Sequence, residues 1–522
     1  MHKLPLTPHT LSRRQALKAV SQAGLIGLGA TYPAWFAHAA MDAGTSSAPD
    51  AVWRAVSRVG YGPTPALIAD IAKADSPRAW ALAQLDTAWA TSQQAPRIEP
   101  DLVSFNAPLP QLMEGAKRER EARKLLKAGE LDEGGSPQLR RMDFSGTPDP
   151  VHFSRTMVQQ ASAWRLISAS QPDVENPLLA RMTEFWFNHL NVYVGKGSVR
   201  PFTGHYLVNV ARANALGKFE DLLLASARHP AMLGYLDQAQ SVAEGSPGPQ
   251  GKTRGLNENY ARELMELHTL GVNGGYSQTD VRELARVLTG WTISPQDASG
   301  FRFANRLHDT GRKVVLGNVF PREGSAAGEQ EGIDAVRTLA RHPATARRIS
   351  LRLARFFVAD EPPASLVEQL VNSFTATQGD MRAVMRTLLQ SPEFWDSKNR
   401  LFKTPMDYAA SALAATHAAR AATKTADMGR RALVLTTGFL AGAGQPLFGW
   451  QTPDGYAFDA ATWLVPEALT RRADFALALA RNLPEQDYLA PYLGAATRDA
   501  VANENPLLRT GLMLASPEFM SK

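Results

Sequence analysis

Helix-start signals recur along almost the whole chain, and this repetition restricts the fold more than any other feature of the sequence. Thr64-Pro65 and Ser76-Pro77 each place a capping hydroxyl before a proline, the arrangement found where α-helices begin. After such starts, apolar residues recur at intervals of three and four, as in Ala51–Val59, a spacing typical of amphipathic helices. We therefore expect an all-α protein: one large helical domain with long loops.

Finer signals support the same fold class. Ser277 with Asp280 resembles a capping box, and Gly271 stands where a C′ glycine would end the preceding helix. Over Phe301–Val319 apolar and polar residues alternate, which predicts one short β-hairpin in an otherwise helical chain.

Two short segments occur twice. Ala227–Ala231 recurs as Ala340–Ala344, and Ser391–Phe394 recurs as Ser516–Phe519. Both carry proline where the first helical residue would sit, so we expect shared helix-start chemistry and not a duplicated domain.

The first 39 residues predict export through the twin-arginine pathway. Ser12–Lys18 matches the twin-arginine consensus, Ala19–Ala30 is weakly apolar, and Ala37-His38-Ala39 forms a small-x-small cleavage site. A membrane-spanning helix needs about 20 strongly apolar residues, and this stretch is too short and too polar. We expect a signal peptide over 1–39, a helical domain over 40–522, no stable membrane span, and a periplasmic or secreted protein that meets the twin-arginine translocase during export.

Charge and cysteine content exclude several classes of protein. The formal net charge is +6, but the leader carries four basic and no acidic residues, so the remaining chain is close to neutral. The basic isoelectric point therefore gives little support for nucleic-acid binding. The absence of cysteine excludes disulfides, thiolate catalysis and cysteine-ligated metal sites.

Polar side chains are densest between Asn257 and His268. On a helix, Asn259, Glu263 and Glu266 would share one face. This face could be the wall of a site that uses carboxylates for acid–base or metal chemistry. We take as candidate catalytic residues the charged and imidazole groups of this segment and of one other helix end: Glu258, Arg262, Glu263, Glu266, His268 and His189.

An alternative interpretation of the same segment is a salt-bridge network that ties helices together. In that case Arg262 and Arg282 would neutralise Glu263 and Glu283. Structural ion pairs gather charge in the same way as active sites, so both interpretations stay open.

Other polar groups extend the candidate site. Glu184 and Asn188 are i,i+4 neighbours ahead of His189, and a loop rich in glycine and proline places two aromatics, expected to be exposed, around an aspartate. These aromatics could stack on a sugar ring or could pin the loop to the core. The candidate substrate-binding residues are the amides, aromatics and histidine–aspartate pair of these segments: Asn188, Asn257, Asn259, His308, Asp309, Trp450, Asp454 and Tyr456.

Several standard motifs are absent from the sequence. We find no P-loop, no G-x-S-x-G elbow, no H-E-x-x-H and no dinucleotide fingerprint. Glu263, Glu266 and His268 lack the Glu-x-x-His spacing of a di-iron bundle. The carboxylates are compatible with a divalent metal, but the sequence identifies no cofactor.

These motifs resemble those of the domain of unknown function 1800 family. The similarity is carried by Asn257–Gly271 and 274–291, and by shorter matches at 60–65, 185–189, 235–237, 308–309, 391–394 and 444–456. It implies an exported bacterial helical protein, often encoded beside a second exported family (number 1501) related to sulfatases and alkaline phosphatases. Phe187 stands where relatives often carry histidine, which weakens a histidine-rich metal site, and Gln451 stands where proline is usual.

Two hypotheses follow. In the first, the protein is an exported hydrolase that acts on an envelope or extracellular polymer through its Glu, His and Asn side chains. In the second, it is a non-catalytic assembly or stabilising partner of the co-exported sulfatase-like protein. Perturbed carboxylates that converge would favour the enzyme, and arginine-paired carboxylates without a pocket would favour the partner.

Overall fold

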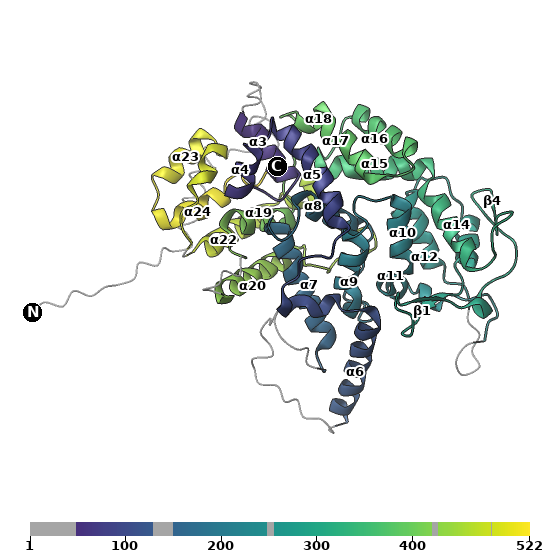
Figure 1. Cartoon of the computed structure of the whole chain (residues 1–522). Helices are drawn as coiled ribbons and strands as arrows, with labels where there is room; N and C mark the ends of the chain where they lie inside the picture. The colour runs from purple at the N-terminus through teal and green to yellow at the C-terminus, as the bar shows by residue number, and fades with distance from the viewer. Residues whose placement is uncertain (1–47, 129–149, 248–254, 420–425, 482) are drawn as a thin grey trace, which may run out of the picture.

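The computed structural model describes residues 48–522 apart from 129–149, 248–254, 420–425 and 482. The predicted leader therefore lies outside the described residues. Helices make up most of what is described, and the strands form two small hairpins (Figure 1). The prediction of a mainly all-α fold is confirmed.

The helices of the first part of the chain are α3 (Ala48–Arg58), α4 (Pro65–Ile71), α5 (Pro77–Ser92), α6 (Leu109–Lys127), α7 (Phe153–Ser170), α8 (Pro177–His189), α9 (Thr203–Tyr206), α10 (Phe219–Arg228), α11 (Pro230–Tyr235), α12 (Glu258–Glu263) and α13 (Gln278–Val287). The later helices are α14 (Glu329–Ala340), α15 (Pro343–Phe357), α16 (Ala364–Ala376), α17 (Met381–Gln390), α18 (Pro392–Trp395), α19 (Pro405–Thr416), α20 (Ala426–Gly442), α21 (Ala460–Trp463), α22 (Pro466–Ala480), α23 (Ala495–Ala502) and α24 (Pro506–Leu514). Two segments are π-helical: η4 (Leu207–Arg212) and η7 (Leu264–Thr269).

Two antiparallel hairpins replace the single one that the sequence predicts. Strand β1 (Trp291–Ile293) pairs with β2 (Phe301–Phe303), and β3 (Lys313–Val315) pairs with β4 (Asn318–Phe320). The second hairpin lies at the end of the predicted segment. Its two-residue turn, Leu316-Gly317, has positive φ at both positions, as tight hairpin turns require. The start of the predicted segment instead pairs with a strand upstream of it.

Helices begin where local capping chemistry predicts. The hydroxyls of Thr64 and Ser76 accept hydrogen bonds at 3.1 Å from backbone N–H groups three residues later. Ser277 and Asp280 form the predicted capping box, and Gly271 has a φ of +89° at the end of the helix. Local hydrogen bonding therefore sets these boundaries before tertiary contacts contribute.

The repeated segments share their chemistry, as expected. His229 and His342 each accept a backbone hydrogen bond two residues on, at 3.1 and 3.2 Å. Ser391 and Ser516 each accept one three residues on, at 3.2 Å. His229, His342 and Ser391 therefore satisfy an N–H group that the starts of α11, α15 and α18 leave unpaired, whereas Ser516 makes the same bond in a turn that no helix follows.

Two hydrophobic clusters form the interior. The first includes Trp186 and Trp291, and the second, beneath α19–α24, includes Tyr408 and Phe475. Helices α7 and α8 contribute to both clusters and lie between the helices α19–α24 on one side and α10–α14 on the other (Figure 1). The polar end of α8 is thereby buried near the centre of the molecule.

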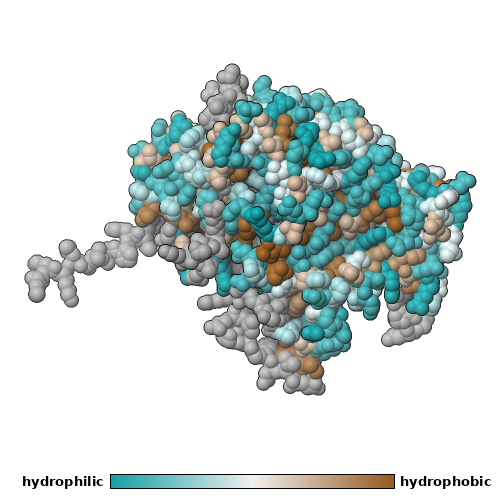
Figure 2. All heavy atoms as spheres, viewed as in Figure 1, coloured by the Kyte–Doolittle hydropathy of each residue, from teal (hydrophilic) through white to brown (hydrophobic). Residues whose placement is uncertain are grey.

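The visible surface is mostly hydrophilic, with scattered apolar patches (Figure 2). Within the described ranges, we find no helix whose length and apolar character would let it span a bilayer.

Candidate functional site

The polar segment at α12 begins as an ordinary helix and then widens. Asn257 caps α12 by accepting a hydrogen bond from the N–H of Asn259 at 2.9 Å. Its amide nitrogen also donates to the carbonyls of Leu236 and Asp237 at 3.2 and 3.0 Å. Both ends of the Asn257 side chain are therefore engaged with backbone, while Asn259 is exposed.

Immediately after α12 the backbone becomes the π-helix η7. The hydroxyl of Thr269 donates to the carbonyl of Leu264 at 2.6 Å, and two carbonyls of η7 accept bonds from other helices. Arg348 Nε donates to Leu267 O at 3.1 Å, and His189 Nε2 lies 3.0 Å from His268 O. Wide turns of this kind frequently occur at functional sites.

A surface network occupies two of the predicted catalytic residues. Arg262 lies 3.5 Å from Glu258 and donates to Gln278 at 2.9 Å, and Gln278 donates to Glu258 at 2.7 Å. This triangle joins α12 to α13. The salt-bridge interpretation expects Arg262 to neutralise Glu263. In the structure Arg262 pairs with Glu258 instead.

The second predicted neutralising pair is also different in the structure. Arg282 forms its ion pair with Glu244 at 2.8 Å, and Glu283 pairs with Arg286 at 2.8 Å. Sequence spacing places a side chain on a helix face, but a flexible arginine then selects the nearest carboxylate in space.

Glu263, Glu266 and Asp454 form the acidic cluster, the name used below for these three residues. Burial raises the pKa of Glu263, the negative charge of Glu266 raises it further, and Asp454 adds to the effect although Arg262 opposes it. Glu263 is half-buried and has no hydrogen bond or ion pair with any described residue. Its environment therefore favours a carboxyl group that keeps its proton at higher pH than an ordinary glutamate.

Both neighbours of Glu263 are held in place. The hydroxyl of Tyr276 donates to Glu266 Oε2 at 2.9 Å; burial and this hydrogen bond raise the pKa of Tyr276 to about 12. Asp454 Oδ1 accepts bonds from Trp450 Nε1 at 2.8 Å and from the hydroxyl of Thr452 at 2.5 Å.

The loop that carries Asp454 is tied to the end of α8. Asn188 donates to Tyr456 O at 2.9 Å and accepts from Tyr456 N at 2.7 Å. Asn191 donates to two further loop carbonyls, at 3.1 and 2.8 Å. Gly455 has a φ of +75°, and a Cβ there would lie 2.0 Å from Asn188 O. Asn188 therefore acts on the loop backbone, and only glycine fits beside it.

The two loop aromatics have different surroundings. Tyr456 is 7% exposed, and its hydroxyl donates to Pro446 O at 2.7 Å, so the expectation of an exposed Tyr456 is wrong. Trp450 is partly exposed, and its ring centroid lies 4.8 Å from that of Tyr456. Tyr456 pins the loop to the core, whereas Trp450 leaves part of a ring beside Asp454 for contact with a ligand.

Arginine and histidine side chains lie near the acidic cluster, in the neighbouring helices. Arg348 and Arg352 of α15 both interact electrostatically with Asp454, and Arg348 also interacts with Glu266. Burial, together with these arginines, lowers the pKa of His268 to about 3 and that of His189 well below its usual value. Both histidines are therefore neutral at physiological pH and suited to hydrogen bonding, not to carrying charge.

His308 and Asp309 belong to a separate buried network. His308 Nε2 lies 3.3 Å from Lys313 Nζ and 3.4 Å from Glu331 Oε1, and Lys313 pairs with Glu331 at 2.7 Å. Asp309 accepts bonds from Arg286 at 2.8 and 3.1 Å. These partners come from α13, β3 and α14, so this pair joins elements around the hairpins and does not belong to the acidic cluster.

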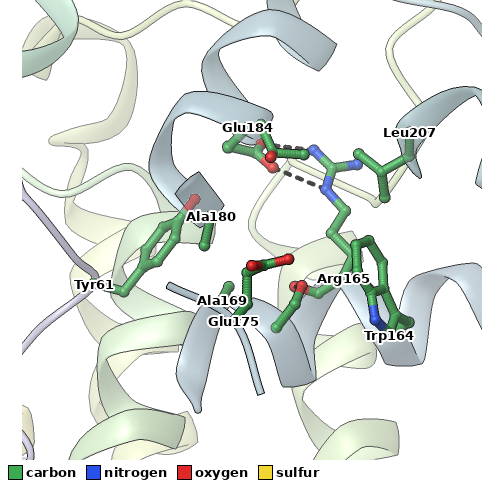
Figure 3. A pocket seen from close by; sticks show the side chains of 10 residues that line it. Tyr61, Trp164, Arg165, Ala169, Glu175, Ala180, Glu184 and Leu207 are labelled. Atoms are coloured by element: carbon green, nitrogen blue, oxygen red, sulfur yellow. Dashed lines mark hydrogen bonds and ion pairs between the residues drawn. The ribbon is translucent and has the colours of Figure 1, made fainter. Parts of the chain in front are cut away.

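A second polar region lies between α7 and α8. Arg165 donates to both oxygens of Glu184, at 2.9 and 2.6 Å, beside a small space that Tyr61 and Glu175 also line. Figure 3 shows the ion pair on one side of this space and the Tyr61 ring on another. The Arg165 guanidinium also lies 4.7 Å from the ring of Phe187. A carboxylate paired in this way is suited to holding α7 and α8 together and not to proton transfer.

Arg348 and Arg352 are absent from the candidates chosen by sequence. Their i,i+4 spacing places them on one helix face, but in a helix with several arginines this signal is common. Only the packing of α15 beside η7 brings them to the acidic cluster. Among the described residues, no group of three or more His, Asp or Glu is arranged to hold a metal ion.

Together, these features define a mainly helical protein with an acidic cluster, half-buried at Glu263 and Glu266 and exposed at Asp454, near arginines of a neighbouring helix. The chain belongs to the family described as Protein of unknown function (DUF1800), whose model matches residues 54–521. The resemblance seen in the sequence motifs is thereby confirmed over nearly the whole chain. No curated protein and no solved structure matches the chain.

Proposed function

We propose that this protein is an exported hydrolase that cleaves an extracellular or envelope polysaccharide by acid–base catalysis at the acidic cluster. The observation that carries the proposal is the environment of Glu263. It is half-buried, has a raised pKa and lies next to two other carboxylates that are held by hydrogen bonds. A carboxyl with a raised pKa beside a second carboxylate is the usual pairing for glycoside hydrolysis.

The three carboxylates would have different roles. Protonated Glu263 would donate its proton to the oxygen of the leaving group. Glu266, oriented by Tyr276, would accept a proton from the attacking water. Asp454 would keep the pKa of Glu263 high through its negative charge. The partly exposed ring of Trp450 would stack on a sugar ring, as aromatic platforms do.

Export completes this proposal. The twin-arginine leader over 1–39 would be removed, leaving a helical domain over 40–522 in the periplasm or outside the cell, where such polymers are found. The twin-arginine pathway carries folded proteins, so the acidic cluster would be assembled before export. Mass spectrometry of protein recovered from periplasm or medium tests this through the position of its N-terminus.

Substitution of Glu263 tests the catalytic role. Purified wild-type protein is assayed for new reducing ends on a panel of extracellular polysaccharides, beside Glu263→Gln and the matched control Glu258→Gln. Glu258 lies on the same helix but belongs to the surface triangle with Arg262 and Gln278. Loss of a general acid typically lowers the rate by about 10²–10⁴-fold, whereas the control should stay within about threefold of wild type. Equal activity of Glu263→Gln and wild type would refute the proposal.

A second candidate function is a stabilising partner for the co-exported sulfatase-like protein. The observation that favours it is the number of buried charges neutralised within the chain, such as Arg165–Glu184 and Arg212–Glu175, which is typical of a rigid scaffold. Affinity purification of the tagged protein from the native envelope distinguishes the two. Stoichiometric recovery of the sulfatase-like protein, without polymer hydrolysis, would favour the partner.

A further inference from the structure

Arg352 carries a charge that no described residue neutralises directly. Its Nε and Nη2 atoms are buried and have no hydrogen-bond partner, and no ion pair within 4.0 Å reaches it from the described part of the chain. Its guanidinium lies 5.3 Å from the ring of Phe458. A buried charge without a counter-charge or full hydrogen bonding is unfavourable, so this position is explained more readily by a ligand than by folding.

The surroundings of Arg352 increase this cost. Arg348 lies one turn before it on α15 and repels it, as does Arg355. Asp454, whose negative charge acts on Arg352, already accepts bonds from Trp450 and Thr452. The result is a cationic floor, defined here as Arg348 and Arg352, beside the acidic cluster.

The cationic floor has the charge and the donor groups that an oxyanion site needs. Arg352 is partly exposed as a residue, whereas its Nε and Nη2 atoms are buried, so a ligand would approach the guanidinium from its Nη1 end. A planar guanidinium binds two oxygens of a carboxylate or sulfate through parallel N–H bonds. Arg348, whose Nε donates to Leu267 O at 3.1 Å, adds a second positive charge.

We infer that Arg352, supported by Arg348, binds an oxyanion substituent on the polymer, a uronate carboxylate or a sulfate ester, next to the sugar unit that Glu263 acts on. The polymer part of this inference rests on the proposed function; the oxyanion site itself does not. The substrate class that follows is an acidic polysaccharide in preference to a neutral one.

The test is a binding measurement that needs no turnover. Trigalacturonate, neutral galactotriose and inorganic sulfate are titrated by calorimetry into the Glu263→Gln protein, and into the same protein with Arg352→Gln, Arg352→Lys or Arg355→Gln added. Arg355 is exposed on the same helix and is the matched control. Circular dichroism melting accompanies each variant, and Arg352→Gln should melt no lower than its parent because it removes an unpaired charge.

We expect trigalacturonate or sulfate to bind at least about tenfold more tightly than galactotriose, since charge-assisted bidentate bonds are strong. Arg352→Gln should abolish this difference, Arg352→Lys should weaken it because the fork is lost, and Arg355→Gln should keep it. Preference for trigalacturonate would assign the anion to a uronate, and preference for sulfate would assign it to a sulfate ester. Binding of both anions no better than galactotriose, or unchanged binding by Arg352→Gln, would overturn the inference. Anion binding in a protein that hydrolyses none of the polymers would leave the site standing and refute the proposed function.

Discussion

Replacement of Asp407 by asparagine should destabilise the folded protein severely. Asp407 lies between two cations: Arg181 donates to one carboxylate oxygen, and Lys522 Nζ lies 2.5 Å from the other. The side chains are 5% exposed for Asp407, 0% for Arg181 and 4% for Lys522. Asparagine keeps the shape of the side chain but removes the charge that both cations face.

The magnitude follows from what remains after the substitution. Nε and Nη2 of Arg181 already have no partner among the described residues, so the guanidinium would lose its direct counter-charge. The rings of Phe356 and Tyr61, 4.3 and 4.7 Å from Arg181, would remain and offset part of the loss. Removing one partner from a buried ion pair typically costs about 3–5 kcal/mol, and we expect Asp407→Asn to lie in this range.

Urea unfolding followed by circular dichroism measures this difference. The matched control is Asp86→Asn, because Asp86 pairs with Arg386 at 2.8 Å but both side chains are well exposed, at 61% and 40%. Such surface pairs contribute at most about 1 kcal/mol. If Asp407→Asn lowered the free energy of unfolding by no more than the control, the charge of Asp407 would not stabilise the fold through Arg181 and Lys522.

Three further predictions concern pH and the loop. Asp454→Asn should lower the pKa of Glu263, because one of the negative charges that raise it is removed; the alkaline limb of the pH–activity profile should move to lower pH, and an unmoved limb would contradict the role given to Asp454. Burial lowers the pKa of Lys522 from 10.5 to about 7, so between these values the unfolded chain binds more protons than the folded one and stability should rise with pH. Lys522→Met should reduce this slope in urea titrations at pH 7, 8 and 9, and an identical slope would place the titration elsewhere. Gly455→Ala should release the loop from Asn188, since the added Cβ cannot fit; limited proteolysis should then cut the loop faster than in wild type, and equal rates would show that the loop adapts.

Helix positions were largely predictable because their causes are local. Thr64, Ser76 and Ser277 act on N–H groups within three residues, so their role can be read from neighbouring letters. The π-helix η7 was not predictable in this way. Two of its carbonyls accept bonds from Arg348 and His189, which are distant in sequence.

Ion-pair partners were the least predictable feature. The salt-bridge interpretation pairs Arg282 with Glu283, but Arg282 pairs with Glu244, 38 residues away. For the candidate site, the sequence places Glu263 and Glu266 on one helix face and includes Asp454 among the candidate binding residues. The sequence does not show that Asp454 lies near those two glutamates. It also does not show that Arg348 and Arg352 lie near the acidic cluster.

The sequence by itself determined the fold class, the helix starts, the family and the segment in which polar chemistry is concentrated. Each depends on periodicity, on capping over three residues or on motif similarity, and so is written in contiguous residues. Tertiary structure alone decided which charges are neutralised and which are not. A charge pairs with whatever lies within a few ångströms, and that distance is set by how α8, η7, α15 and the Asp454 loop pack together. The raised pKa of Glu263 and the unpaired donors of Arg352 are consequences of that packing.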